Sequence, residues 1–133
     1  METGLNNSVV LVTGGAGGIG ETICRAFASE GSKVIVHYHK SSRNAEKIAN
    51  EIGGISVKAD LTDSKQALSL IDTIIQKYGK LDVCIANAGY YPPEPLSLWD
   101  IDNDRWNKTI SSNLGVAVNT ARGFLQEASR TGT

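Results

Sequence analysis

Residues 9–20 of this chain are Val-Val-Leu-Val-Thr-Gly-Gly-Ala-Gly-Gly-Ile-Gly, an apolar run that leads directly into a glycine-rich turn. A short β-branched run such as Val9–Val12 is typical of a buried strand in a parallel sheet. Glycines after such a strand let backbone amides approach a pyrophosphate, and the following helix N-terminus adds partial positive charge. Gly15, Gly17 and Gly20 satisfy the pattern G-x-G-x-x-G. The segment therefore predicts a dinucleotide-binding loop, and the alternative is a tight structural turn.

Strand and helix patterns alternate along the rest of the chain. We predict strands at Val9–Thr13, Lys33–Tyr38, Ile55–Ala59 and Leu81–Ala86. We predict helices at Gly18–Ser29, Ser42–Glu51, Ser64–Tyr78 and, after a proline-rich loop, from about Asp102 to Ala128. Alternation of this kind implies a parallel sheet with right-handed crossovers. The expected fold is an α/β, Rossmann-like, doubly wound domain of three layers, with four strands in the order 3-2-1-4.

Composition limits the classes of function. The chain has 133 residues, 41% of them hydrophobic, and a net charge of −1, which suits one globular domain without a basic nucleic-acid surface. No apolar stretch approaches the ~20 residues needed to span a bilayer, and the N-terminus lacks the pattern of a signal peptide. We therefore expect a cytoplasmic protein with neither a nucleic-acid nor a membrane partner. Cys24 and Cys84 are predicted core residues, and His37 and His39 lack nearby ligands, so no metal site is expected.

Four landmarks together resemble one family. The pattern Thr-Gly-x-x-x-Gly-x-Gly, from Thr13 to Gly20, resembles the cofactor loop of ordinary single-domain short-chain dehydrogenases/reductases. Asp60 closes the third predicted strand, where the family uses an acidic side chain near the adenine. Asn87–Gly89 resembles the family's Asn-Ala-Gly motif beside the cofactor ribose. Asn113 matches the asparagine that helps to organise the family's active site and its proton-relay water, and it is the one catalytic residue that the resemblance assigns here.

The family's acid/base residues have no counterpart in this sequence. The resemblance implies a Ser and a Tyr-x-x-x-Lys pair beyond the fifth strand, in which the Lys lowers the pKa of the Tyr. A phenol that titrates near 10 needs such a cation to act near neutral pH. The four tyrosines are followed four positions later by other residues: Tyr38 by Ser42, Tyr78 by Asp82, Tyr90 by Glu94 and Tyr91 by Pro95. Residues 1–133 therefore resemble the NAD(P)-binding front half of such an enzyme, truncated before its catalytic Ser/Tyr/Lys segment.

The predicted strand order leaves Leu81–Ala86 as an apolar edge. Such an edge invites pairing with another chain. Either the molecule contains the missing half outside these 133 residues, or the fragment associates to cover the edge. We favour the first interpretation, because independently stable parallel sheets normally have both faces covered. The resemblance also leads us to expect a homo-oligomer.

The end of the second predicted strand bears on cofactor choice. Rossmann proteins that prefer NAD place an acidic residue there for the ribose 2′-hydroxyl. This chain has Tyr38 followed by His-Lys-Ser-Ser-Arg, so Lys40 and Arg43 could bind a 2′-phosphate. We expect NADP(H) to be preferred, with NAD(H) possible; the alternative is a solvated turn into a helix capped by Ser41 or Ser42. The residues expected to bind the cofactor are Gly14, Gly18, Ile19, Gly20, Tyr38, His39, Lys40, Ser41, Arg43, Asp60, Leu61, Asn87, Ala88 and Gly89.

Three further segments receive structural interpretations. Tyr90–Pro95 is expected to form a wall of the substrate entrance, or simply a rigid loop. Trp99 and Trp106 are expected to pack onto the core. Residues Val116, Val118 and Ala121 fit either a helix face used in family dimers or ordinary core.

The expected function follows from the resemblance. It implies an NADP(H)-dependent oxidoreductase that transfers a hydride between nicotinamide and a small-molecule carbonyl or secondary alcohol, similar to a 3-oxoacyl or sugar reductase. The 133 residues alone are expected to be inactive. The alternatives are a catalytically inactive dinucleotide-binding module and an assembly fragment that pairs with another subunit.

Overall fold

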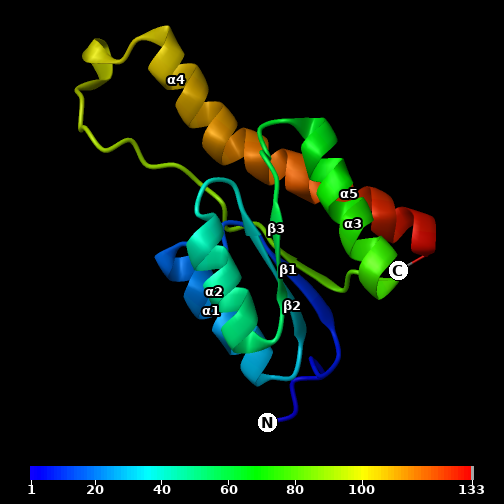
Figure 1. The fold of residues 1–133 in the computed structure, drawn as a ribbon. Helices are drawn as coiled ribbons and strands as arrows, with labels where there is room; N and C mark the ends of the chain where they lie inside the picture. Colours follow the sequence, from blue (N-terminus) through cyan, green and yellow to red (C-terminus); the bar gives the residue numbers. More distant parts are fainter. Residues whose placement is uncertain (133) are drawn as a thin grey trace.

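The computed structural model describes residues 1–132 and shows an alternating α/β chain (Figure 1). The strands are β1 (Val9–Val12), β2 (Lys33–Tyr38), β3 (Ile55–Lys58) and β4 (Val83–Ile85). The helices are α1 (Gly18–Ser29), α2 (Ser42–Ile52), α3 (Ser64–Tyr78), α4 (Asn103–Ile110) and α5 (Val116–Thr131), with a 3₁₀ turn at Leu98–Asp100 and a π-helical turn at Ser111–Gly115.

The four strands form one parallel sheet in the order β3-β2-β1-β4, as predicted. In the register of the two central strands, Val10 lies opposite Val34 and Val12 opposite Val36. β4 is shorter than predicted because the chain turns after it, where the Asn87 amide donates to the Ile85 carbonyl. Within the described chain, β4 pairs on one side only, with β1.

Helices cover both faces of the sheet, because alternate side chains of each strand point to opposite faces. Val10, Val12, Val34 and Val36 pack with residues of α1 and α2 on one face. Val9, Leu11 and Ile35 pack with residues of α3 and with Val116 of α5 on the other. Figure 1 shows these two helix pairs on opposite sides of the strands. The predicted three-layer Rossmann-like fold is confirmed.

The helix ends show why α1 and α3 match their predicted bounds. Asp63 caps α3 by accepting a hydrogen bond from the Lys65 amide at 2.9 Å, and Gly79 ends the helix with a positive φ of 77°. Gly31 has a φ of 82° just after α1. Gly53, with a φ of 68°, ends α2 one residue later than predicted.

The long C-terminal helix predicted from about Asp102 to Ala128 is interrupted. Asp102 caps α4 through the Arg105 amide at 2.7 Å, but residues 111–115 form a π-helical turn before α5 begins. Asn113 lies in this turn, and its side-chain amide donates to the Thr109 carbonyl at 2.9 Å. Single π-helical turns inside α-helices occur frequently at functional sites.

The prediction that both tryptophans pack onto the core is wrong. Trp99 is 86% exposed and Trp106 is 53% exposed. The segment that carries them, the loop after β4 and helix α4, projects beyond the sheet (Figure 1). Cys24 is buried as expected, whereas Cys84, on the edge strand, is only partly buried. Val116 belongs to the core, and Val118 is exposed.

These differences in burial predict a contrast in stability. Ile74 is completely buried between α3 and the sheet, so Ile74→Ala should lower the free energy of unfolding by about 2–5 kcal/mol. Trp99→Ala, the control, should change it by no more than about 0.5 kcal/mol because the ring is exposed. Urea unfolding of both variants measures the difference, and a large loss for Trp99→Ala would contradict the exposed position.

Candidate functional site

A cavity of about 980 Å³ opens at the carboxyl ends of the strands. In open α/β sheets, ligands bind at this edge, where the strand order reverses. Here the strand order reverses between β1 and β4. Of the fourteen residues predicted to bind a cofactor, all except Arg43 line the cavity: Gly14, Gly18, Ile19, Gly20, Tyr38, His39, Lys40, Ser41, Asp60, Leu61, Asn87, Ala88 and Gly89. Asn113 lines it too.

The peptide between Thr13 and Gly14 is clamped from both sides. Its N–H, on Gly14, donates to Nδ1 of His37 at 3.0 Å. Its carbonyl, on Thr13, accepts from Nδ2 of Asn87 at 3.1 Å, and the same Nδ2 lies 3.2 Å from the Gly14 carbonyl. The Thr13 hydroxyl oxygen accepts from the amides of Asn87 and Ala88, each at 2.9 Å. The ends of β1, β2 and β4 are therefore fixed to one another at this point.

Two glycines of the turn are required by the fold itself. Gly14 has a φ of 61°, and a Cβ there would lie 2.9 Å from the Ala88 Cα. A Cβ at Gly20 would collide with the Gly14 carbonyl oxygen. At Gly18, by contrast, a Cβ would meet nothing within 4 Å, although Gly18 lines the cavity. A side chain added at Gly18 would therefore border the cavity without disturbing the turn.

The N-terminus of α1 faces this cavity. The Glu21 amide makes the first bond of the helix, to the Gly17 carbonyl at 2.7 Å. The preceding amides of Gly18, Ile19 and Gly20 have no carbonyl of their own helix to bond. Together with the helix dipole, these N–H groups form a site for an anion such as a phosphate.

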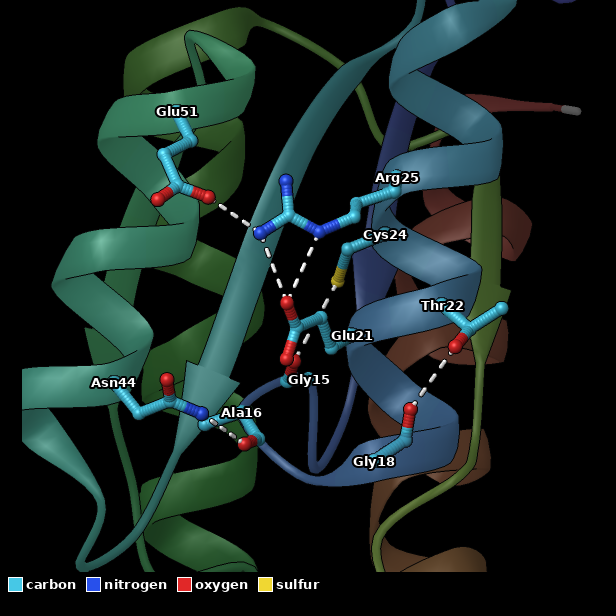
Figure 2. Close-up of polar contacts among 9 residues, drawn as sticks. All are labelled: Gly15, Ala16, Gly18, Glu21, Thr22, Cys24, Arg25, Asn44 and Glu51. Atoms are coloured by element: carbon cyan, nitrogen blue, oxygen red, sulfur yellow. Dashed lines mark hydrogen bonds and ion pairs between the residues drawn. The ribbon is translucent and has the colours of Figure 1, made fainter.

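Side chains of α1 and α2 hold the glycine-rich turn from behind (Figure 2). Nδ2 of Asn44, on α2, donates to the Ala16 carbonyl at 2.6 Å. Sγ of Cys24, on α1, lies 3.9 Å from the Gly15 carbonyl oxygen. Burial raises the pKa of the Cys24 thiol to about 11, so this thiol is neutral near pH 7. Arg25 joins the two helices through ion pairs with Glu21 and Glu51, which are solvent-exposed and so add little stability.

The end of β2 supplies cationic and hydroxyl groups to the cavity. Lys40 and Ser41 line it, whereas Arg43 lies in the first turn of α2, outside the lining. Ser41 occupies the N-cap position of α2, but its side chain makes no capping hydrogen bond. The segment from Tyr38 to Arg43 carries no carboxylate.

Asp60 also lines the cavity and supplies a carboxylate. It follows β3, the strand next to β2 in the sheet. Its Oδ1 accepts from the hydroxyl of Thr62 at 2.6 Å and from the Thr62 amide at 3.0 Å. The hydroxyl bond is the main reason that the pKa of Asp60 lies below its usual range, so the group is ionised at neutral pH. Asn119 of α5 supports the same loop by donating to the Leu61 carbonyl at 2.9 Å.

Asn113 joins the π-helical turn to the loop after β4. Its Oδ1 accepts from the Tyr90 amide at 3.0 Å, and its Nδ2 donates to the Tyr90 carbonyl at 2.8 Å. A Cβ at Gly89 would approach the Asn113 Oδ1 to 2.9 Å, so this glycine allows the close approach. The Lys108 ammonium lies 4.6 Å from the centre of the Tyr90 ring. Asn113 thus fixes the wall of the cavity that Tyr90 begins.

Two residues that hold the site together were not among the predicted site residues. Thr13 and His37 both point to the face of the sheet that carries Leu11 and Ile35. The signal was present for His37, because a polar residue two positions after a buried Ile35 on the same strand face must find a partner inside. No group of three or more His, Cys, Asp or Glu within residues 1–132 is arranged to hold a metal ion. No helix in that range is long and apolar enough to cross a membrane.

Comparison with known proteins agrees with this geometry. The family model described as short chain dehydrogenase matches residues 8–133. The chain belongs to the short-chain dehydrogenase family. Members of this family are oxidoreductases, and the resemblance predicted from the sequence is confirmed.

Relatives with sequence similarity include two fungal members of the family. A sorbose reductase of Schizosaccharomyces pombe is 38% identical over 124 residues, which cover 89% of this chain and 48% of that protein. A short chain dehydrogenase/reductase of Colletotrichum higginsianum is 36% identical over 121 residues, covering 84% of this chain and 43% of that protein. The chain therefore spans about half the length of the curated relatives it matches.

Solved structures of short-chain dehydrogenases share the fold. The enzyme from Burkholderia cenocepacia, crystallised in complex with NADP, superposes with a TM-score of 0.85 at 28% identity, covering 92% of this chain and 51% of that one. The enzyme from Mycobacterium avium gives a TM-score of 0.85 at 26% identity, covering 96% of this chain and 50% of that one.

The two classes of glycine predict different effects of substitution. Gly18→Val should abolish binding of NADPH while leaving the thermal unfolding midpoint almost unchanged, because Gly18 lines the cavity and a Cβ there meets no other atom. Gly20→Ala should lower the unfolding midpoint as well, because its Cβ collides with the Gly14 carbonyl. Fluorescence titration with NADPH and thermal unfolding by circular dichroism measure the two effects. Unchanged affinity in Gly18→Val would remove the assignment of this turn to the phosphates.

Proposed function

We propose that residues 1–133 form the dinucleotide-binding half of an NADP(H)-dependent oxidoreductase that acts on a small carbonyl compound or secondary alcohol. The observation that carries the proposal is one cavity that joins the N-terminus of α1 to a cationic, carboxylate-free end of β2. The family membership supports it, as does the NADP bound in the Burkholderia cenocepacia structure. A bound nicotinamide dinucleotide would supply the hydride of the reaction.

The residues of the cavity suit the parts of such a ligand. The amides of Gly18, Ile19 and Gly20 would hold the pyrophosphate, since they offer N–H donors and the positive end of a helix dipole. Asp60 would lie near the adenine, because it closes β3 beside the end of β2. The turn Asn87–Gly89, which is tied to β1 through Thr13, would border the ribose next to the nicotinamide.

The end of β2 favours a 2′-phosphate over a 2′-hydroxyl. An Asp or Glu at this place would repel the phosphate, and the segment has none. Lys40 lines the cavity, while Arg43 is exposed in the first turn of α2, outside the lining, and would have to reach the phosphate with its long side chain. Charge complementarity at these two cations is the basis for preferring NADP(H), with NAD(H) as a weaker ligand.

The chemistry of the complete reaction would need groups beyond those described here. Residues 1–133 contain Asn113 but no Tyr-x-x-x-Lys pair. Both N–H groups of the Asn113 amide donate to the carbonyls of Tyr90 and Thr109, and its Oδ1 accepts from the Tyr90 amide, so in this half of the enzyme it positions the cavity wall. We place the acid/base residues in the other half of the protein. The similarity to a sorbose reductase suggests a sugar as the substrate, and a 3-oxoacyl compound is the alternative that the family resemblance implies.

A second candidate function follows from the sheet edge and from α5. β4 pairs only with β1 in the described chain, and α5 exposes an apolar groove that contains Val118 and Leu125. Both surfaces suit association, so a homo-oligomer remains our proposal. A dinucleotide-binding module or an assembly fragment without activity is the alternative that these surfaces favour.

The assignment of the 2′-phosphate site predicts a change in selectivity. Replacing Lys40 and Arg43 together by alanine should lower the ratio of NADPH to NADH affinity by about tenfold or more, since a hydrogen bond to a charged group contributes about 1.5–3 kcal/mol. Titration of both cofactors against both proteins measures the ratio. Equal losses for the two cofactors would mean that the cations only support the fold.

The absence of an acid/base pair predicts an inactive half. A polypeptide of residues 1–133 should bind NADPH yet show no NADPH-dependent reduction of carbonyl compounds, because general acid catalysis contributes about 10²–10⁴-fold and the orienting groups are absent as well. A steady-state assay of the purified polypeptide, with its mass confirmed, tests this. Robust reduction would contradict the proposal, and Tyr90 and Tyr91 would be the first proton donors to replace.

A further inference from the structure

His37 lies at the end of β2, between the glycine-rich turn and the end of β3, and is only 3% exposed. Its Nδ1 accepts a hydrogen bond from the Gly14 amide at 3.0 Å, and its Nε2 lies 2.9 Å from the Ala59 carbonyl oxygen. An amide N–H can only donate and a carbonyl oxygen can only accept. The two partners therefore fix one state of the ring: a neutral imidazole with its hydrogen on Nε2.

Protonation of this ring would remove one of the two bonds. An imidazolium carries a hydrogen on Nδ1 as well as on Nε2, so its Nδ1–H would point at the Gly14 N–H. The Gly14 amide would have to turn away from its acceptor. Because the Thr13 carbonyl of the same peptide is held by Asn87, such a rotation would disturb both sides of the clamp. The conformation of the turn thus depends on the neutral form of His37.

The surroundings of His37 favour that neutral form. Burial is the largest cause that lowers its pKa, the bond to the Ala59 carbonyl opposes this, and His39 lowers the pKa further. The glycine-rich turn after β1 and Val116 of α5 line the same cavity and carry no charge. The loop after β3 contributes Asp60, whose carboxylate accepts a hydrogen bond from Thr62. The titratable groups that share the cavity with it are Tyr38, His39, Lys40, Asp60, Tyr90, Tyr91 and Lys108.

We propose that His37 is a positioning residue for dinucleotide binding: it holds the phosphate-binding turn in its binding conformation only while its imidazole is neutral, so affinity for a pyrophosphate falls as the pH falls. The inference rests on the proposed function, because it takes the turn of Gly14 and the start of α1 as the pyrophosphate site. It goes beyond that function by making the site sensitive to pH through a residue whose two ring nitrogens are both bonded to the backbone.

The direction of the pH effect follows from linkage. The pKa of His37 in the folded protein lies below the value of about 6.5 for a free histidine. Its contribution to stability is therefore complete above about pH 6.5 and is lost as the pH falls through the folded pKa. Ligand binding to the ordered turn should lose affinity over the acidic end of the same range.

The test is a pH series of ADP-ribose binding, measured by calorimetry between about pH 8 and pH 5. ADP-ribose carries the pyrophosphate but no 2′-phosphate, whose own titration near pH 6 would obscure the effect. For the natural sequence, the dissociation constant should rise by about tenfold for each pH unit below the pKa of His37. Circular dichroism at each pH confirms that the protein is folded.

Two variants separate His37 from the chain's other histidine. His37→Asn keeps an acceptor, Oδ1, near the position of Nδ1 but cannot become charged, so its affinity should no longer depend on pH. His39→Asn should keep the pH dependence of the natural sequence, whatever its effect on affinity near pH 8. His39 is exposed, and the two are the only histidines present.

The outcomes distinguish this inference from the proposed function. No binding of ADP-ribose at about pH 8 would contradict the dinucleotide site itself. Binding at about pH 8 that does not weaken with acid, or that strengthens because an imidazolium attracts the pyrophosphate, would overturn the role of His37 alone. If His37→Asn does not fold, long-range ¹H–¹⁵N spectra of the natural sequence decide: a hydrogen on Nδ1 at neutral pH would overturn the inference.

Discussion

The peptide between Thr13 and Gly14 is the point on which the rest of the site depends. Its N–H donates to the His37 side chain on β2, and its carbonyl accepts from the Asn87 side chain, which follows β4. A buried peptide group without partners would be unfavourable, so these bonds stabilise the turn as well as orient it. Once this peptide is fixed, the direction of Gly15–Gly17, and with it the N-terminus of α1, follows. The anion site is a consequence of that one constraint.

The parallel sheet brings residues that are far apart in the sequence close together in space. Each strand ends at the same edge, so Lys40, Asp60 and Asn87 line one cavity although they are widely spaced in the sequence. The helices support this edge from outside the cavity. Asn44 donates to the glycine-rich turn, and Asn119 donates to the loop after β3. The polar groups of the sheet edge are thus divided between those that hold the backbone and those that face the cavity.

Local patterns were enough to predict the sheet and most of the helices. The bounds of α1 and α3 followed from apolar spacing with glycines at their ends, and the strand order followed from alternation and handedness. The π-helical turn could not be predicted in this way, because it accompanies bonds between Asn113 and Tyr90, which is 23 positions away. The prediction that Trp99 is buried was wrong for a related reason. A large ring is buried only where another layer packs against it, and local sequence does not show where such a layer lies.

The candidate site followed from the sequence only in part. All the predicted cofactor residues except Arg43 line the cavity, since glycines and strand-end polar groups are visible as a pattern. That pattern did not find His37 or Thr13, whose side chains form hydrogen bonds with the backbone at the ends of neighbouring strands. Within residues 1–132, every buried side-chain N or O atom has a hydrogen-bond partner. Because these internal bonds are already formed, a ligand that binds the amides at the start of α1 would meet an ordered turn and lose little free energy to reorganisation. We therefore expect residues whose side chains hold this backbone, such as Thr13 and His37, to influence affinity as well as the groups that face the ligand.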